Sequence, residues 1–237
     1  MMRPPHLPSP WRDWGGTGET VVLMGEPGMA SAVLDSVAEA LIESFQVLVL
    51  DTWSLTPEDL LNDLVNRGIT TFKNVSFGKG MRLALTWAAE SGDLVERLVL
   101  IGPAPITPFM PMQPVRDESW ESFRVRMARL SYFSPWTRYH EVLARIAFYT
   151  SGADPTGEPR ALVDVDYACV QGPTLILRAT RPALDGRAFS TSDSEIAAMA
   201  LGILGSRLIE LKRHDHWSIL LNPTVDVAAF IRAFLNF

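Results

Sequence analysis

The segment 74–81 reads Asn-Val-Ser-Phe-Gly-Lys-Gly-Met and is typical of a sharp turn between a buried strand and a helix. In hydrolytic enzymes such a turn, written G-x-S-x-G, lifts a nucleophilic serine into a pocket. The closing glycine is present here as Gly80, but the central position falls on Gly78, which has no side chain. Because glycine tolerates a strained backbone, the sequence predicts that the turn is kept while the serine chemistry is lost.

A second alignment of the same turn makes Ser76 the nucleophile, with Asn74 and Gly78 as the small flanking residues. It needs a longer helix after the turn, and it places asparagine where the strand must pass tightly beneath it. Counting back without gaps from Val95 instead places Gly78 at the central position. Gly78 is therefore the expected degenerate nucleophile position, and Ser76 remains the alternative nucleophile.

The elements that would position this turn alternate between apolar runs of strand length and segments with helical spacing, which is typical of a parallel sheet covered on both faces. The expected strands are 20–24, 47–50, 71–75, 97–101, 174–178 and 208–211. The expected helices between them are 29–44, 57–67, 80–91, 194–204 and 225–235. The sequence thus predicts an α/β fold with a mostly parallel sheet.

Residues 104–170 interrupt this alternation, so we expect a core of residues 1–103 and 171–237 and a helical lid between them. Two helices are expected in the lid, over 118–130 and 136–148. The segment is rich in proline and aromatic residues, which suit either a cap with its own small core or a lid over an apolar pocket. The expected pocket-lining aromatic residues are Trp120, Phe123, Tyr132, Phe133 and Trp136.

Composition narrows the class of protein. A chain of 237 residues with 47% hydrophobic content can bury one large core. The net charge of −6 and the absence of a basic run argue against nucleic acid or an anionic membrane as partner. One cysteine, Cys169, excludes a disulfide framework, and no set of metal ligands or cofactor motif is visible. We expect a cytoplasmic protein without metal or cofactor, and its oligomeric state stays open.

Five segments resemble the α/β-hydrolase superfamily and occur in the order of that family. Residues 23–28 (Leu-Met-Gly-Glu-Pro-Gly) resemble its oxyanion loop, 49–51 the end of the next strand, and 74–81 its nucleophile turn. Residues 95–102 resemble a further strand, and 215–217 with 222–223 resemble the segment that supplies the catalytic histidine. The resemblance implies the α/β-hydrolase fold, although little strand-like sequence precedes Thr20, so the first hairpin is expected to be absent or reduced.

The resemblance also assigns roles to single residues. His216 lies at the histidine position and can carry a proton near neutral pH. Pro182 lies at the acid position, and Asp185 is either a displaced acid or an ordinary surface residue. Met24 replaces the histidine of the oxyanion loop. Three further residues, Gly25, Phe77 and Trp217, are expected at the oxyanion site and pocket.

The two backbone donors of the oxyanion site would come from Glu26 and Lys79. Their opposite charges allow two interpretations that the sequence does not separate. They form an ion pair that closes the site, or they offer an acid and an amine to a substrate.

Together these residues favour a non-hydrolytic enzyme that transfers protons beside a carbonyl: an epimerase, a lyase or a cyclase. His216 would carry the proton, with Lys79 or Glu26 as its partner, and the substrate would be a small or peptide-like apolar molecule from natural-product biosynthesis. In lacking the nucleophile, the chain resembles the peptide aspartate epimerase of bottromycin-type biosynthesis. The alternatives are a serine hydrolase or thioesterase that uses Ser76, and a ligand-binding protein without catalysis.

Overall fold

The computed structural model describes residues 9–25, 31–51, 55–102, 117–129, 165–180, 193–212, 214, 218–221 and 225–237. The described strands form a seven-stranded sheet in the order β1-β3-β2-β4-β5-β6-β7. All neighbouring pairs are parallel except β1 and β3, which run antiparallel. The fold class expected from the sequence is therefore confirmed.

The strands agree closely with the apolar runs of the sequence. Their bounds are β1 Trp11–Gly15, β2 Thr20–Met24, β3 Gln46–Leu50, β4 Phe72–Phe77, β5 Val95–Ile101, β6 Thr174–Ala179 and β7 Arg207–Leu211. One strand, β1, was not expected, because Asp13 and the glycines that follow interrupt its apolar pattern. The first hairpin of the fold is thus reduced rather than lost, since β1 pairs with β3 along its length.

Most helices lie where the spacing of apolar residues places them, but α1 is shorter than the expected 29–44 because a 3-10 turn, Ser31–Leu34, precedes it, and α7 was not expected. Their bounds are α1 Asp35–Leu41, α2 Pro57–Asn66, α3 Met81–Glu90, α4 Trp120–Arg129, α6 Asp193–Gly202, α7 Ser218–Leu221 and α8 Val225–Leu235. Thr56 begins α2 as expected: its hydroxyl accepts a hydrogen bond from the N–H of Asp59, and Pro57 occupies the first turn. The second helix expected in the lid, 136–148, lies outside the described residues.

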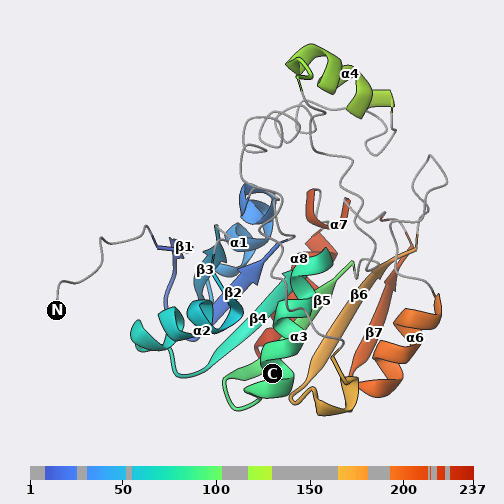
Figure 1. Ribbon diagram of the computed structural model, residues 1–237. Helices are drawn as coiled ribbons and strands as arrows, with labels where there is room; N and C mark the ends of the chain where they lie inside the picture. Colours follow the sequence, from blue (N-terminus) through green and yellow to red (C-terminus); the bar gives the residue numbers. More distant parts are fainter. Residues whose placement is uncertain are drawn as a thin grey trace.

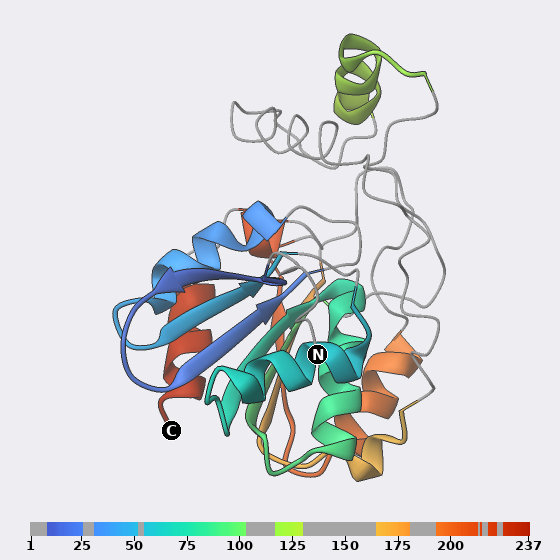
Figure 2. The same ribbon diagram turned by 60° about the vertical axis from the view of Figure 1, so that its left-hand side comes forward.

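Helices cover both faces of the sheet (Figures 1 and 2), and each face has a buried core. On one face α1, α7 and α8 pack against residues such as Val21, Val75 and Val99. On the other face α2, α3 and α6 pack against residues such as Val22 and Leu98. Because successive residues of a strand point to opposite faces, the continuous apolar runs of β2 and β5 are what a sheet covered on both sides requires.

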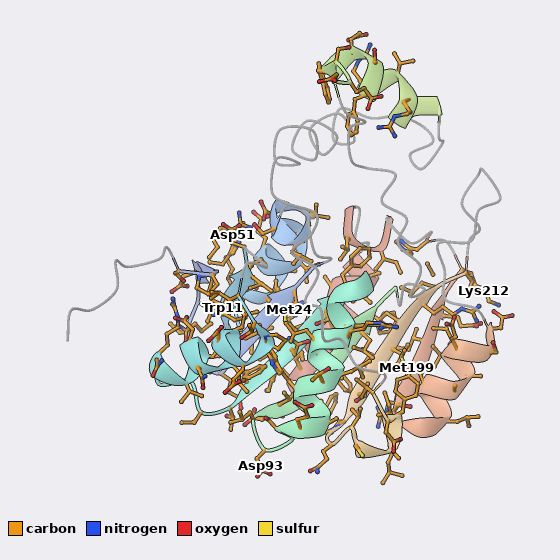
Figure 3. All side chains as sticks on the ribbon, in the orientation of Figure 1. Trp11, Met24, Asp51, Asp93, Met199 and Lys212 are labelled. Atoms are coloured by element: carbon orange, nitrogen blue, oxygen red, sulfur yellow. The ribbon has the colours of Figure 1, made fainter. Side chains whose placement is uncertain are left out.

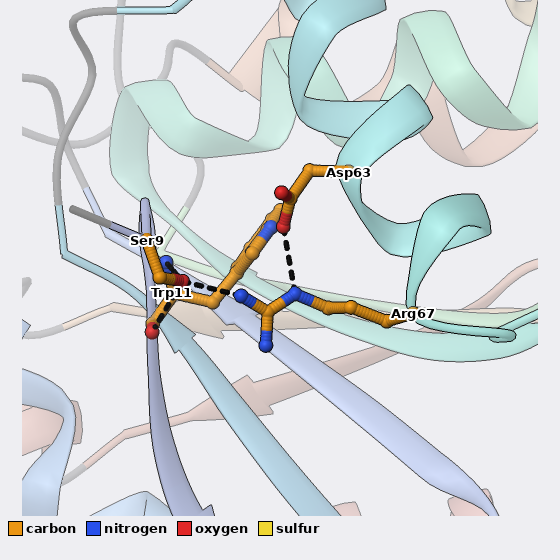
Figure 4. Close-up of polar contacts among 4 residues, drawn as sticks. All are labelled: Ser9, Trp11, Asp63 and Arg67. Atoms are coloured by element: carbon orange, nitrogen blue, oxygen red, sulfur yellow. Dashed lines mark hydrogen bonds and ion pairs between the residues drawn. The ribbon is translucent and has the colours of Figure 1, made fainter. Parts of the chain in front are cut away.

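The antiparallel edge strand is fastened to α2 by a small polar cluster (Figure 4). The guanidinium of Arg67 donates to the hydroxyl of Ser9 at 2.5 Å and to the carboxylate of Asp63 at 2.7 Å. The same hydroxyl accepts from the N–H of Trp11 at 3.0 Å and lies 3.0 Å from its carbonyl oxygen. These contacts hold the start of β1 beside the end of α2.

Candidate functional site

The turn after β4 has the strand–turn–helix geometry expected from the sequence. The strand ends at Phe77, a short 3-10 turn covers Gly78–Gly80, and α3 begins at Met81. Gly78 has a φ of +54°, in the left-handed region that side chains disfavour. Gly80 is required for space: a Cβ at this position would lie 2.1 Å from the carbonyl oxygen of Gly25. The backbone of the turn is therefore in close contact with Gly25, the residue that follows β2.

Ser76 lies inside β4 rather than on the turn. It is fully buried, at 0% exposure, and its hydroxyl donates a 2.6 Å hydrogen bond to Oδ1 of Asn74. The amide nitrogen of Asn74 in turn donates to the carbonyl oxygen of Val22 at 3.2 Å. Ser76 pairs in register with Met24 and Leu100, which face the helix α3 side of the sheet. The hydroxyl thus takes part in a buried polar link between β4 and β2.

The segment after β2 begins beside the turn. Met24 is the last residue of β2 and is fully buried, as is Phe77 at the end of β4. They belong to the cores on opposite faces of the sheet, so neither side chain is exposed at the turn. Gly25 contributes its carbonyl oxygen to the close contact with Gly80. Glu26 lies outside the described residues, and of Lys79 only the backbone is described, so their pairing stays a prediction.

Ser31, the first described residue after segment 26–30, contacts Asp51 at the end of β3. Ser31, at the start of the 3-10 turn that precedes α1, is 7% exposed, and its hydroxyl donates to Oδ1 of Asp51. Asp51 directly follows β3, and its own N–H donates to the carbonyl oxygen of Pro10 at 2.8 Å. Met24, the last residue of β2, and Asp51, directly after β3, are labelled in Figure 3 and thus lie at the carboxyl ends of neighbouring parallel strands. Gly25 and Ser31 thus each contact a neighbouring element, Gly25 at Gly80 and Ser31 at Asp51.

From the sequence, Asn74 was named only as a residue flanking Ser76 and Asp51 only as part of segment 49–51, and neither of their contacts was predicted. An asparagine two residues before a serine in a buried strand was a usable signal, since both side chains then lie on one face. The pairing of Ser31 with Asp51 had no such signal, because it joins segments that are distant in the sequence.

Helix α4 is the main element in the described part of the expected lid, which also includes residues 165–170. Phe123 is fully buried and Trp120 half-buried, with ring centroids 6.1 Å apart. Arg126 lies over the ring of Phe123 at 5.1 Å and forms two hydrogen bonds to Glu118, at 2.9 and 2.7 Å. In both ribbon views α4 lies beyond the carboxyl ends of the strands (Figures 1 and 2). Tyr132, Phe133 and Trp136 lie outside the described residues.

The expected proton carrier also falls outside the described part. This applies to His216, Trp217, Pro182 and Asp185. The preceding histidine, His214, is described: it is 7% exposed, and its N–H donates to the carbonyl oxygen of Leu211 at 3.2 Å. His214, three residues after the end of β7, is therefore a buried histidine.

Two further properties hold for the described part of the chain. It contains no group of His, Cys, Asp and Glu side chains that can hold a metal ion. None of its helices has the length and apolar character needed to cross a membrane.

Comparison with known proteins reveals similarity in structure alone. No protein-family model and no curated protein matches the sequence. The structure is similar to an enol-lactonase from Burkholderia xenovorans LB400, with 20% identity over 96% of each chain and a TM-score of 0.72. It is also similar to a meta-cleavage product hydrolase from Pseudomonas fluorescens IP01, with 19% identity over 95% of this chain and 93% of that one and a TM-score of 0.71.

A third similar structure is a carboxylesterase from Bacillus subtilis, with 14% identity over 95% of this chain and 86% of that one and a TM-score of 0.72. The chain has the α/β-hydrolase fold. At these identities the comparison establishes the fold, and the chemistry must be argued from the site. Within the α/β-hydrolase fold, the turn after β4 is the position that normally presents the nucleophile.

Proposed function

We propose that this protein is a non-hydrolytic enzyme of the α/β-hydrolase fold that transfers protons beside the carbonyl group of a small or peptide-like apolar molecule. The observation that carries the proposal is the pair of positions Ser76 and Gly78. The hydroxyl of Ser76 is buried inside β4 and donates to Asn74, while the residue on the turn has no side chain. A covalent serine mechanism therefore has no hydroxyl at the place where this fold presents one.

The turn still offers what proton transfer needs. Backbone N–H groups at a tight turn can stabilise negative charge on oxygen whatever their side chains, and an enolate carries such charge. In the proposed reaction His216 takes a proton from the carbon beside the carbonyl, and an enolate forms. The proton then returns to that carbon, and return to the opposite face inverts it. No bond to the protein forms, and no other group is consumed. Glu26 or Lys79 would be the second proton carrier.

The substrate would enter beneath the lid. The aromatic residues of segment 104–170 suit an apolar molecule, and Trp120 and Phe123 already pack together on α4. The three similar structures are named for a lactone, a meta-cleavage product and a carboxylic ester, which supports a carbonyl compound as the ligand.

The same names support a second candidate, a serine hydrolase or thioesterase that uses Ser76. That function requires Ser76 to leave its hydrogen bond with Asn74 and reach a substrate. A third candidate, a ligand-binding protein without catalysis, shares the fold and the lid.

The three candidates give different results in one experiment. The protein is incubated in D2O with a panel of acyl thioesters, β-keto esters and peptides, and deuterium uptake and hydrolysis are followed by mass spectrometry and NMR. We expect deuterium at the carbon beside the carbonyl, its loss in His216→Gln, its retention in Ser76→Ala, and no labelling by a fluorophosphonate. Hydrolysis and fluorophosphonate labelling that both disappear in Ser76→Ala would establish the serine hydrolase. Binding of a panel member without uptake or hydrolysis would favour the binding protein.

A further inference from the structure

Strand β7 forms one end of the sheet and has β6 as its single neighbour among the described strands (Figure 1). The N–H of Thr180, directly after β6, donates to the carbonyl oxygen of Leu211 at 3.4 Å, so the main-chain groups of Leu211 point towards β6. Because these groups alternate along a strand, those of Leu208 and Glu210 point away from the sheet. Two N–H groups and two carbonyl groups thus form an edge that no other described strand covers.

Three exposed leucines lie on β7 or on the segment that precedes it. Leu208 is 38% exposed, and it faces the α6 side of the sheet because its neighbour in register, Ile176, packs with that helix. Leu201, on α6, and Leu204, in the turn that leads into β7, are 87% and 88% exposed. An exposed leucine on an edge strand favours association with another chain.

The opposite edge of the sheet is built differently. Strand β1 has an irregularity in register between Asp13 and Gly15, and Gly15 has a φ of +85°. Such irregularities twist an edge and prevent pairing with another chain. The described part of β7 contains no proline, no glycine and no irregularity in its pairing with β6. The protection found at β1 is therefore missing at β7.

We propose that β7 pairs antiparallel with β7 of a second copy of this chain, about a two-fold axis at Ile209. In this register Leu208 lies opposite Glu210 of the other copy, and each such pair can exchange both of its N–H···O bonds. A register shifted to an axis at Glu210 would place two carboxylates opposite each other, which is unfavourable. An axis at Ile209 thus lets the outward main-chain groups of β7 bond to those of a second copy without placing two carboxylates directly opposite each other.

The same register places the remaining side chains. Arg207 lies opposite Leu211 of the other copy, and because residues three apart in a strand point to opposite faces, Arg207 and Glu210 do not meet across the axis. Leu208 also lies diagonally across the axis from Leu208 of the other copy, on the side of α6. The pairing would therefore cover apolar surface as well as main-chain groups.

Such a dimer keeps the turn after β4 away from the interface. Two strands, β5 and β6, lie between β4 and β7, and the axis is perpendicular to the sheet. The two carboxyl edges would then point in opposite directions within one continuous sheet. The proposal is accordingly independent of the reaction proposed above.

The test is the mass of the intact protein in solution as a function of concentration, by light scattering and sedimentation equilibrium. We expect a species of twice 26.3 kDa. Leu208→Lys should raise the dissociation constant of the dimer at least about tenfold, because two ammonium groups would approach across the axis. Val65→Lys, at a 48% exposed position on α2, is the matched control and should leave the constant unchanged.

Hydrogen exchange gives a second measurement that does not depend on a variant. The amides of Leu208 and Glu210 should exchange slowly in the dimer and quickly on dilution, whereas that of Ile209, which points towards β6, should stay protected in both. A monomer at every concentration would overturn the proposal. So would a dimer that is insensitive to Leu208→Lys and leaves the amides of Leu208 and Glu210 unprotected.

Discussion

The hydroxyl of Ser76 donates a 2.6 Å hydrogen bond to Oδ1 of Asn74, and both side chains are fully buried beneath α3. A buried asparagine oxygen without a donor is costly, so this bond makes a polar pair tolerable inside an apolar layer. The amide group of Asn74 extends the link to the carbonyl oxygen of Val22 in β2. The only hydroxyl in the middle of β4 is thereby part of the packing between two strands.

We expect Ser76→Ala to lower the free energy of unfolding by about 1 to 3 kcal/mol, because Oδ1 of Asn74 then lies buried without a donor. Urea unfolding measures this loss, and a double-mutant cycle with Asn74→Ala should give a coupling of about 1 kcal/mol. An unchanged stability together with lost turnover would instead assign Ser76 to catalysis.

Gly80 provides a prediction about the turn itself. Gly80→Ala places a methyl group 2.1 Å from the carbonyl oxygen of Gly25, and backbone on both sides must shift. We expect a loss of more than about 3 kcal/mol or failure to fold, as for severe overpacking. Gly68→Ala is the control: it has a φ of +80° with open space around a Cβ, so it should cost only about 1 to 2 kcal/mol. Equal losses in the two variants would contradict a special contact at Gly80.

The fold could be predicted from the sequence because its central strands are buried on both faces. Such strands appear as continuous apolar runs, and the expected strand Thr20–Met24 has the bounds that the structure shows. The expected helix Val225–Leu235 also has the observed bounds. Strand β1 could not be predicted in this way, since an edge strand needs apolar residues on fewer positions and tolerates Asp13 and Gly15.

The site was predictable only in its backbone. Glycines that a turn requires can be read from the sequence, as at Gly78 and Gly80. Contacts between distant segments cannot be read from the sequence, because the partners of Ser31 and Lys73 depend on how the strands and helices pack. The roles expected for His216, Glu26 and the side chain of Lys79 stay predictions.

Lys73 tests such a contact between distant segments. Its ammonium group is buried, donates to the carbonyl oxygen of Leu235 at 2.6 Å and to Glu19 at 2.5 Å, and lies 5.2 Å from the ring centre of Phe45. A cation at the carboxyl end of a helix compensates its unpaired carbonyl groups. The side chain thus fastens α8 to β4.

We expect Lys73→Met to lower the free energy of unfolding by about 1 to 3 kcal/mol, because it removes a charged donor from a buried carbonyl. Hydrogen exchange should show faster opening of the last turn of α8. Glu19→Gln is the control and should have a smaller effect, since Glu19 is 64% exposed and its pair with Lys73 is partly screened by solvent. A larger loss in Glu19→Gln would show that the ion pair, and not the helix end, is the main contact.

Asp35, in the first turn of α1, provides a prediction about pH. Burial raises the pKa of Asp35 above the ordinary value, and the carboxylates of Glu39 and Asp51 act in the same direction. Arg12, at 2.5 Å, lowers the pKa but does not outweigh burial. A raised pKa means that the folded protein holds this proton more tightly than the unfolded chain. The contribution of Asp35 to stability is then largest below about pH 4 and is lost as pH rises through the folded pKa.

Asp35→Asn removes this dependence. The stability of the variant relative to the parent should therefore increase as the pH is raised from about 3 to about 7, as measured by urea unfolding at each pH. Asp63→Asn, which removes a carboxylate from the pair with Arg67 on α2, controls for the loss of one negative charge. If the relative stability of Asp35→Asn instead falls over this range, the ion pair with Arg12 outweighs burial, and the pKa of Asp35 is lowered in the folded protein.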